Sequence, residues 1–364
     1  MRMKAILLDL FSSFKKAKPW KKVLLVFLLL MNLFFFTTAV IKVNYEVLTP
    51  GSINSIVNTN AEANDYWVLK IDTDNSPGNV NTVGVYHHKK ISYFQYLISK
   101  LSDKIDLAPF DPKTDTTKEE DIIRGDLQKD YSIDYALIVA YEAAKEIDPN
   151  IHIEYSFQGL RVLAVNRDSR SGLKPGDLIT KIDGRSFEKA DEFRTILEEF
   201  SGDDVIKLEI LRNGETLELD SQMMETEDGY KLGIQIHEKM TIDPNKTKPK
   251  FERNNKLQSR GPSGGAMMAL AIYNALTDKD ITKGKVIIGT GEIALDGTVG
   301  AIGGVPQKIA TAALYGADIF FIGEDNYEEA LAAYQEMKAL FKPGFRLIKV
   351  KEFKDIISEL EALP

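Results

Sequence analysis

The most apolar stretch of the chain runs from Val23 to Ile41 and is interrupted only by Asn32, Thr37 and Thr38. As a helix it would be about 28 Å long, close to the ~30 Å hydrocarbon core of a bilayer. Seven basic residues and one acidic residue precede it within positions 1–22. The positive-inside rule therefore predicts a basic cytoplasmic N-terminus (1–22), one transmembrane helix (23–41) and an extracytoplasmic remainder, in a single-pass protein of the cell membrane.

A cleaved signal peptide is the alternative interpretation of this stretch. Thr37-Thr38-Ala39 offers a weak small-residue cleavage site. The apolar region of a signal peptide, however, usually spans only about 7 to 15 residues. The length of the stretch and its lysine-rich flank favour a retained anchor.

Residues 45–150 contain short apolar runs, such as Trp67-Val68-Leu69, separated by polar segments rich in turn residues. The region ends in a stripe of apolar residues at helical spacing: Ile133, Leu137, Ala140, Tyr141 and Ala144. This spacing predicts an amphipathic helix that packs on a core.

Residues 151–232 have a different pattern, typical of a small, mainly β module. Short strands are predicted at 161–165, 178–182 and 205–211, with turns at 174–177 and 212–215. Between the second and third strands, residues 190–200 carry Phe193, Ile196, Leu197 and Phe200 on one side of a predicted helix.

From residue 233 to 364 the pattern is mixed α/β again. Apolar runs at 285–288 and 319–322 predict buried strands, and residues 353–360 predict a final helix. The expected fold class is therefore α+β, with an α/β domain, a β module and one N-terminal transmembrane helix.

Composition excludes several kinds of chemistry. The chain has no cysteine and only 4 histidines, none of them in an H-E-x-x-H motif, so neither a thiol nucleophile nor a histidine-rich metal centre is expected. The net charge of -8, with the positive charge concentrated before the apolar stretch, argues against nucleic acid as a partner. No metal or other cofactor is predicted.

Three glycine-rich motifs mark the C-terminal region: Gly261-Pro262-Ser263-Gly264-Gly265, Gly289-Thr290-Gly291-Glu292-Ile293-Ala294 and Gly303-Gly304-Val305-Pro306-Gln307-Lys308. The first matches G-x-S-x-G, but every histidine precedes Ser263, which excludes the Ser–acid–His order of an α/β-hydrolase. The second matches a dinucleotide fingerprint, but Leu295-Asp296-Gly297 follows where a helix should begin, so no nucleotide is expected there.

A serine without a histidine can be activated by a lysine that burial keeps neutral. Lys308 is the candidate base, and Ser263 lies at the start of a predicted helix whose backbone N–H groups can stabilise an oxyanion. Each residue alone has a plainer interpretation, Ser263 as a helix cap and Lys308 as a solvated lysine.

Two resemblances to known families support the Ser–Lys interpretation. The run from Ser171 to Ile179, with Gly159-Leu160 before it and Ile182-Asp183-Gly184 after it, resembles a PDZ domain of the bacterial protease-associated kind. The resemblance implies a peptide groove between the first strand and the helix. It assigns Phe157, Gln158, Gly159 and Leu160 to the carboxylate loop, with Val162 and Phe193 lining the groove.

The three glycine-rich motifs, in their order and with Lys308 45 positions after Ser263, resemble the proteolytic domain of Lon-type Ser–Lys peptidases. With the anchor and the PDZ-like module, the chain is similar to the membrane-anchored PDZ and Lon-domain serine endopeptidases of Gram-positive bacteria, the SepM/YlbL-like group. The resemblance implies that Ser263 is the nucleophile, Lys308 the general base and Thr290 the residue that orients the lysine. Gly264 and Arg260 depart from the family pattern.

The resemblance also implies that residues 45–150 and 233–364 form one peptidase domain into which the PDZ-like module, 151–232, is inserted. No P-loop motif occurs in the sequence, so no nucleotide partner is expected. The predicted function is ATP-independent cleavage of extracytoplasmic peptides or unfolded protein segments, with the PDZ-like module binding the substrate. The alternative is a membrane-tethered PDZ scaffold that binds peptides without cutting them.

Overall fold

The computed structural model describes residues 14–58, 67–75, 78–112, 116–227, 229–254 and 259–364. It divides into two compact units, Met1–Thr49 with Tyr86–Asp115, and Pro50–Val85 with Thr116–Pro364. Most of the predicted cytoplasmic segment, up to position 13, lies outside the described residues.

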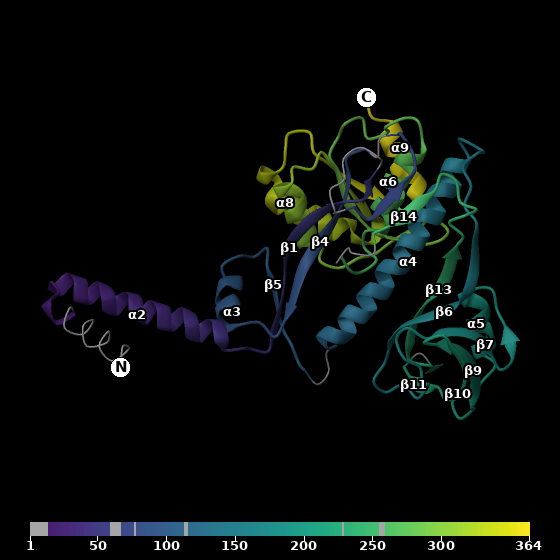
Figure 1. Ribbon diagram of the computed structural model, residues 1–364, viewed down its shortest axis with the longest axis horizontal. Coiled ribbons are helices and arrows are strands. Elements are labelled where there is room, and N and C mark those ends of the chain that lie inside the picture. Colours follow the sequence, from purple (N-terminus) through teal and green to yellow (C-terminus); the bar gives the residue numbers. More distant parts are fainter. Residues whose placement is uncertain (1–13, 59–66, 76–77, 113–115, 228, 255–258) are drawn as a thin grey trace, which may run out of the picture. The chain divides into compact units, whose positions relative to one another are not determined.

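The first unit contains the apolar helix α2 (Pro19–Val40), which begins four residues before the predicted start because Pro19 suits the first turn of a helix. Within the described part of the chain, α2 is the one helix long and apolar enough to cross a membrane. The unit also holds α3 (Tyr93–Ser99) and β5 (Asp106–Pro109), which pairs with the start of β1 (Tyr45–Ser55) (Figure 1).

The second unit contains most of a sheet with the strand order β19-β18-β15-β4-β1-β5. Its further strands are β4 (Val80–Lys89), β15 (Ile287–Thr290), β18 (Ile319–Gly323) and β19 (Arg346–Val350). β15 lies parallel to β4 and to β18, and β18 lies parallel to β19. All residues of β15 and β18 are buried, which explains their continuous apolar sequences.

Helices cover both faces of this sheet. Ile287 and Phe321 belong to one core with residues of α4 (Lys118–Lys145), α6 (Gly265–Leu276) and α9 (Phe353–Glu361). Ile288 and Phe320 belong to a second core with residues of α7 (Val305–Leu314) and α8 (Tyr327–Met337). Neighbouring residues of a strand thus point to opposite cores.

Short elements complete this part. They are β2 (Val57–Asn58), β3 (Leu69–Ile71), β14 (Phe251–Arg253), the hairpin of β16 (Glu292–Ile293) and β17 (Val299–Gly300), and two 3-10 turns, η1 (Glu324–Asn326) and η2 (Lys338–Leu340).

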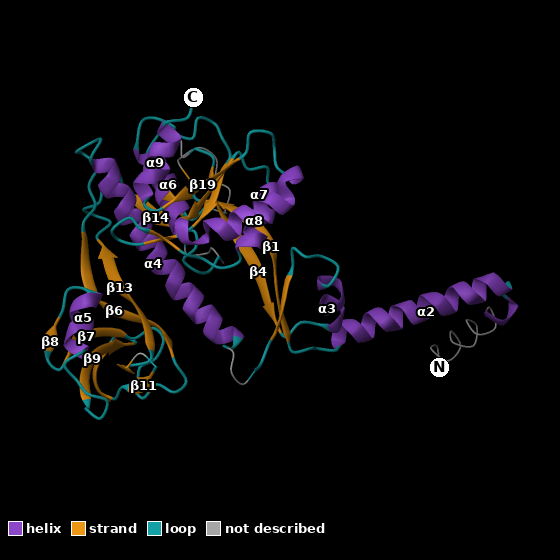
Figure 2. Ribbon diagram, turned by 180° about the vertical axis from the view of Figure 1, so that it is seen from behind, coloured by secondary structure: helices purple, strands orange, loops and turns teal. Residues whose placement is uncertain are grey.

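The β module is built around a sheet with the order β10-β9-β7-β6-β13. Its elements are β6 (Tyr155–Val165), β7 (Leu178–Ile182), β8 (Arg185–Ser186), α5 (Ala190–Leu197), β9 (Ile206–Arg212), β10 (Glu215–Ser221), β11 (Met224–Thr226), β12 (Gly229–Lys231) and β13 (Ile234–Ile242). Figure 2 shows the strands of the module in orange with α5 beside them. One core of aliphatic and aromatic residues, including Phe193, holds the sheet and helix together.

The structure confirms the predicted α+β class and places strands and helices where the sequence predicts them. β13 lies after the predicted end of the β module at residue 232. It pairs antiparallel with β6 over its whole length, from Ile234 opposite Val165 to Ile242 opposite Tyr155. The sheet of the β module therefore extends past residue 232.

Candidate active site

Ser263 lies in the short loop that leads into α6. Gly264 is the N-cap residue, and every residue of the helix from Gly265 to Leu276 is buried. The apolar sequence of α6 fixes it inside the core, so the half-buried serine before it occupies a defined position at the helix N-terminus.

Lys308 and Thr290 come from two different elements that meet near this loop. Thr290 is the last residue of β15, and Lys308 lies in the first turn of α7, which begins after Gly304 with a left-handed φ of 70°. Lys308 Nζ donates a hydrogen bond to Thr290 Oγ1 (3.0 Å), and Thr290 Oγ1 donates to the Ser263 carbonyl (2.9 Å). The three predicted catalytic residues are thus joined in one hydrogen-bonded chain.

Burial changes the protonation of Lys308. Its side chain is only 2% exposed, and this desolvation lowers its pKa from 10.5 to about 7, against the opposing effect of the Glu292 carboxylate. Burial also raises the pKa of Glu292, an effect that the lysine charge partly offsets. A substantial share of Lys308 is therefore a neutral amine at neutral pH, as a general base must be.

The backbone around Ser263 is held by several hydrogen bonds. The Ser263 carbonyl also accepts from Gly291 N (2.8 Å), and the Gly291 carbonyl accepts from Ala266 N (3.1 Å). Gly265 N donates to the Pro262 carbonyl (3.0 Å). These bonds use the N–H groups of Gly265 and Ala266, which leaves those of Ser263 and Gly264 as the candidates for binding an oxyanion at the helix start.

The structure explains why glycine stands at position 264. A Cβ atom there would lie 2.8 Å from Cγ2 and 3.3 Å from Cβ of Thr82 on β4. The methyl group of Thr82 therefore occupies the space that an alanine at 264 would need.

The structure does not support the predicted peptide groove. Phe157, Gln158, Gly159 and Leu160 lie within the strand β6 and do not form a loop. β6 is an interior strand of the sheet, paired with β7 at Leu160 and Arg161 and with β13 from Tyr155 to Val165. Leu160 and Val162 are 0% exposed and Phe193 is 2% exposed, because all three fill the core of the module.

The edge strand beside α5 is β13, the last strand in the sheet order. Its Ile234 and Ile236 belong to the same core as Phe193, and Glu238 Oε1 accepts from Ala190 N at the start of α5 (2.7 Å). Leu232-Gly233-Ile234 leads into this strand, with a left-handed φ of 69° at Gly233. This glycine between two apolar residues was the sequence signal that could have located the edge.

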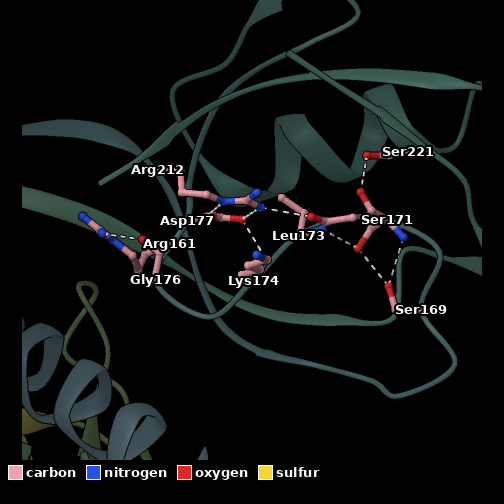
Figure 3. A network of polar contacts seen from close by, with 10 residues as sticks. Arg161, Ser169, Ser171, Leu173, Lys174, Gly176, Asp177, Arg212 and Ser221 are labelled. Atoms are coloured by element: carbon pink, nitrogen blue, oxygen red, sulfur yellow. Dashed lines mark hydrogen bonds and ion pairs between the residues drawn. The ribbon is translucent and has the colours of Figure 1, made fainter. Parts of the chain in front are cut away.

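Hydrogen bonds hold the backbone of the loop Leu232-Gly233-Ile234 in place. The Gly233 carbonyl accepts from Asn166 N (2.7 Å), and Ser169 Oγ donates to the Leu232 carbonyl (2.6 Å). Figure 3 shows the continuation through Ser169 and Ser171, and the buried Asp177 paired with Arg212 (2.7 Å) nearby. The turn around Ser171, which carries the PDZ resemblance, thus fixes the loop before β13.

Among the side chains of the described ranges, no group of three or more His, Cys, Asp or Glu is placed to hold a metal ion.

A hydrogen-bonded Ser–Thr–Lys arrangement in an α/β domain, beside a small β module, defines a serine peptidase with a peptide-binding module. Residues 255–362 match the family model of the Lon protease (S16) C-terminal proteolytic domain, and residues 138–222 match the PDZ domain model. The chain therefore carries a Lon-type serine-peptidase domain together with a PDZ domain.

Two of the individual relatives match over about 100 residues, a small part of their own length. Lon protease 2 of Bacillus subtilis is 33% identical over 106 residues, which cover 29% of this chain and 17% of that protein. Lon protease of Mycoplasma pneumoniae is 38% identical over 100 residues, 28% of this chain and 12% of that protein. The crystal structure of the PDZ domain of an SdrC-like protein from Listeria innocua is 31% identical, covers 22% of this chain and 94% of that one, and gives a TM-score of 0.21.

The contact between Gly264 and Thr82 generates a first prediction. Gly264→Ala should destabilise the protein by about 1 to 3 kcal/mol through overpacking, and so lower its melting temperature by several degrees. Thr82→Ser removes the obstructing methyl group and should restore most of the loss in the double variant. Calorimetry of the wild type, the two single variants and the double variant measures their melting temperatures. A double variant no more stable than Gly264→Ala would show that the methyl group is not the obstacle.

Proposed function

We propose that the protein is an ATP-independent, membrane-anchored serine endopeptidase that cleaves extracytoplasmic peptides or unfolded protein segments. The observation that carries the proposal is the chain Lys308–Thr290–Ser263, with a buried lysine whose pKa is lowered to about 7. Such a lysine supplies the base that the serine needs in a chain whose histidines all precede the serine loop.

In this mechanism the neutral Lys308 amine takes the proton of the Ser263 hydroxyl while Oγ attacks the scissile carbonyl. The oxyanion forms near the N-terminus of α6, where the N–H groups of Ser263 and Gly264 can bind it. The lysine then gives its proton to the leaving amine, and water hydrolyses the acyl-enzyme by the same proton route. Thr290 accepts a hydrogen bond from the lysine and thereby orients it.

Placement in the membrane is part of the proposal. The helix α2 and the lysines before it favour an anchor with the basic end in the cytoplasm and the peptidase outside. Because the sequence has no P-loop, substrates should be segments that need no unfolding.

We also propose that the PDZ domain is inserted into a discontinuous peptidase domain. The parallel pairing of β4 with β15, and the shared core of α4 and α6, support a peptidase domain built from both sides of the insertion. The boundaries 45–150, 151–232 and 233–364 remain predictions, with β13 paired to the sheet of the inserted module.

The substrate-binding edge is proposed at β13 and not at β6. A peptide would add as a strand to β13, next to α5, with its end at the loop Leu232-Gly233-Ile234.

The peptidase assignment predicts that the full-length protein in detergent hydrolyses a short fluorogenic unstructured peptide without ATP and in the presence of a chelator. Ser263→Ala should remove all turnover and leave the melting temperature within about 2 °C, because a half-buried hydroxyl is lost without a large cavity. Full activity of Ser263→Ala, or no activity of the wild type on any unstructured peptide, would contradict the assignment.

The base assignment predicts a pH profile. Protonated Lys308 cannot accept a proton, so kcat/KM should rise from pH 5 to 9 with a midpoint near the lowered pKa of about 7. Lys308→Arg should be inactive over this range because arginine stays protonated. Thr290→Ala should retain partial activity with a shifted midpoint. Near wild-type turnover by Lys308→Arg would place the general base elsewhere.

The edge assignment is tested with two matched glycines, Gly233 and Gly172, which both have a φ of 69°. Gly233→Ala strains the loop before β13 and brings a Cβ to 2.6 Å from Met224 Sδ, whereas Gly172→Ala meets nothing within 4 Å. Gly233→Ala should slow the cleavage of casein, a natively unfolded protein, several-fold more than that of the short peptide. Gly172→Ala should leave the ratio of the two rates unchanged. Equal ratios in both variants would show that β13 is not the substrate edge.

A further inference from the structure

The helix α4 holds the segment before Ser263 at several points. Gly261 N donates to the Gly125 carbonyl (2.8 Å), and the Arg260 guanidinium pairs with Asp126 (3.2 Å). Two turns further along, Ser132 Oγ donates to the Pro262 carbonyl (3.0 Å). Ser132 is 0% exposed, so this last bond is shielded from water.

The contact at Ser132 depends on a close approach of α4 and α6. A Cβ atom on Gly265 would lie 2.8 Å from Ser132 Oγ and 2.7 Å from a methyl carbon of Ile293. Glycine at this position therefore lets the hydroxyl reach the Pro262 carbonyl, which also accepts the bond from Gly265 N.

The same stretch of α4 contacts β13, the proposed substrate edge. Tyr135 Oη donates to the Glu238 carbonyl (2.8 Å). The buried Asp134 carboxylate accepts from Lys239 Nζ (2.8 Å) and also pairs with Arg253. The ring of Tyr131 lies against that of His237 at a tilt of 33°, with 4.4 Å between the ring centroids. Four residues within one short stretch of α4 thus contact β13 or the serine loop: Tyr131, Ser132, Asp134 and Tyr135.

We propose that Ser132 positions the Ser263 loop for catalysis, and that Tyr135 makes this positioning depend on β13. The inference rests on the proposed peptidase function. Ser132 and Tyr135 touch no reacting atom, so both are positioning residues.

The reason lies in how the serine loop is connected. A shift of Pro262 also moves the Ser263 carbonyl, which receives the bonds from Thr290 Oγ1 and Gly291 N. Thr290 in turn holds Lys308. A displacement well below 1 Å at Pro262 therefore changes the alignment of nucleophile and base, to which catalytic rates are sensitive. The alignment governs the chemical step and not the initial binding of the short test peptide, so kcat should change and KM should not.

The test uses the full-length protein in detergent and the short fluorogenic peptide. Tyr141 provides a matched control, because it is a buried tyrosine of the same helix whose Oη donates to the Pro249 carbonyl, also at 2.8 Å. Tyr135→Phe and Tyr141→Phe each lose one buried hydroxyl bond to a carbonyl and should lower the melting temperature equally. Only Tyr135→Phe should lower kcat, by about threefold.

Ser132→Ala should lower kcat by about tenfold and leave KM within about twofold. Ser132→Cys keeps the side-chain volume, but its thiol is a weak hydrogen-bond donor, so it should lower kcat as Ser132→Ala does. This variant provides the test if Ser132→Ala does not fold. The double variant Ser132→Ala/Tyr135→Phe should resemble Ser132→Ala alone, because Tyr135 acts through Ser132.

Three results would overturn the inference while the wild type remains active and Ser263→Ala inactive: unchanged kcat in both Ser132 variants, equal kcat losses in Tyr135→Phe and Tyr141→Phe, or multiplicative losses in the double variant. A wild-type protein that cleaves no peptide would instead refute the proposed function itself, which separates the two failures.

Discussion

The burial of the Lys308 amine is the constraint on which the site depends. An ammonium group is costly to hold away from water, so the lysine keeps its place only if it can be neutral and hydrogen-bonded. The fold meets both conditions, because α7 packs against the sheet beside β15 and Thr290 at the end of β15 offers its hydroxyl. Glu292 limits how far the pKa falls, and so keeps it near neutrality.

The catalytic candidates could be predicted from sequence because three glycine-rich motifs, in their order, resemble those of Lon-type proteolytic domains. The residues alone indicated Ser263 and Lys308, each with a plainer interpretation, and the role of Thr290 came from the resemblance. The helices α4 and α5 and the strands β7 and β9 could be predicted from the spacing of their apolar residues. The structure has a helix or a strand at each of these places. Long-range contacts determine how these elements pack together, but not whether each is a helix or a strand.

The proposed substrate edge could not be predicted in the same way, because it depends on which strands pair. Phe157-Gln158-Gly159-Leu160 and Lys231-Leu232-Gly233-Ile234 share a glycine directly followed by an aliphatic residue. Only the pairing of β13 with β6 decides between them, since it places the first segment inside the sheet and the second before its edge strand. Sequence periodicity shows which face of a strand is buried, but not which neighbour it has.

The helix α4 contacts both the serine loop and β13. In the proposed insertion, the chain must return from the PDZ domain to the peptidase domain, and β13 is the strand that leads back. The returning strand therefore has to pack against the helix on which the peptidase core is built. Asp134 is buried on that helix and needs the cations of Lys239 and Arg253, so the strand and the segment after it are held to α4 by charge as well as by packing. Ser132 lies two residues before Asp134 and contacts the serine loop. One turn of α4 therefore both holds β13 and positions the loop that carries the nucleophile.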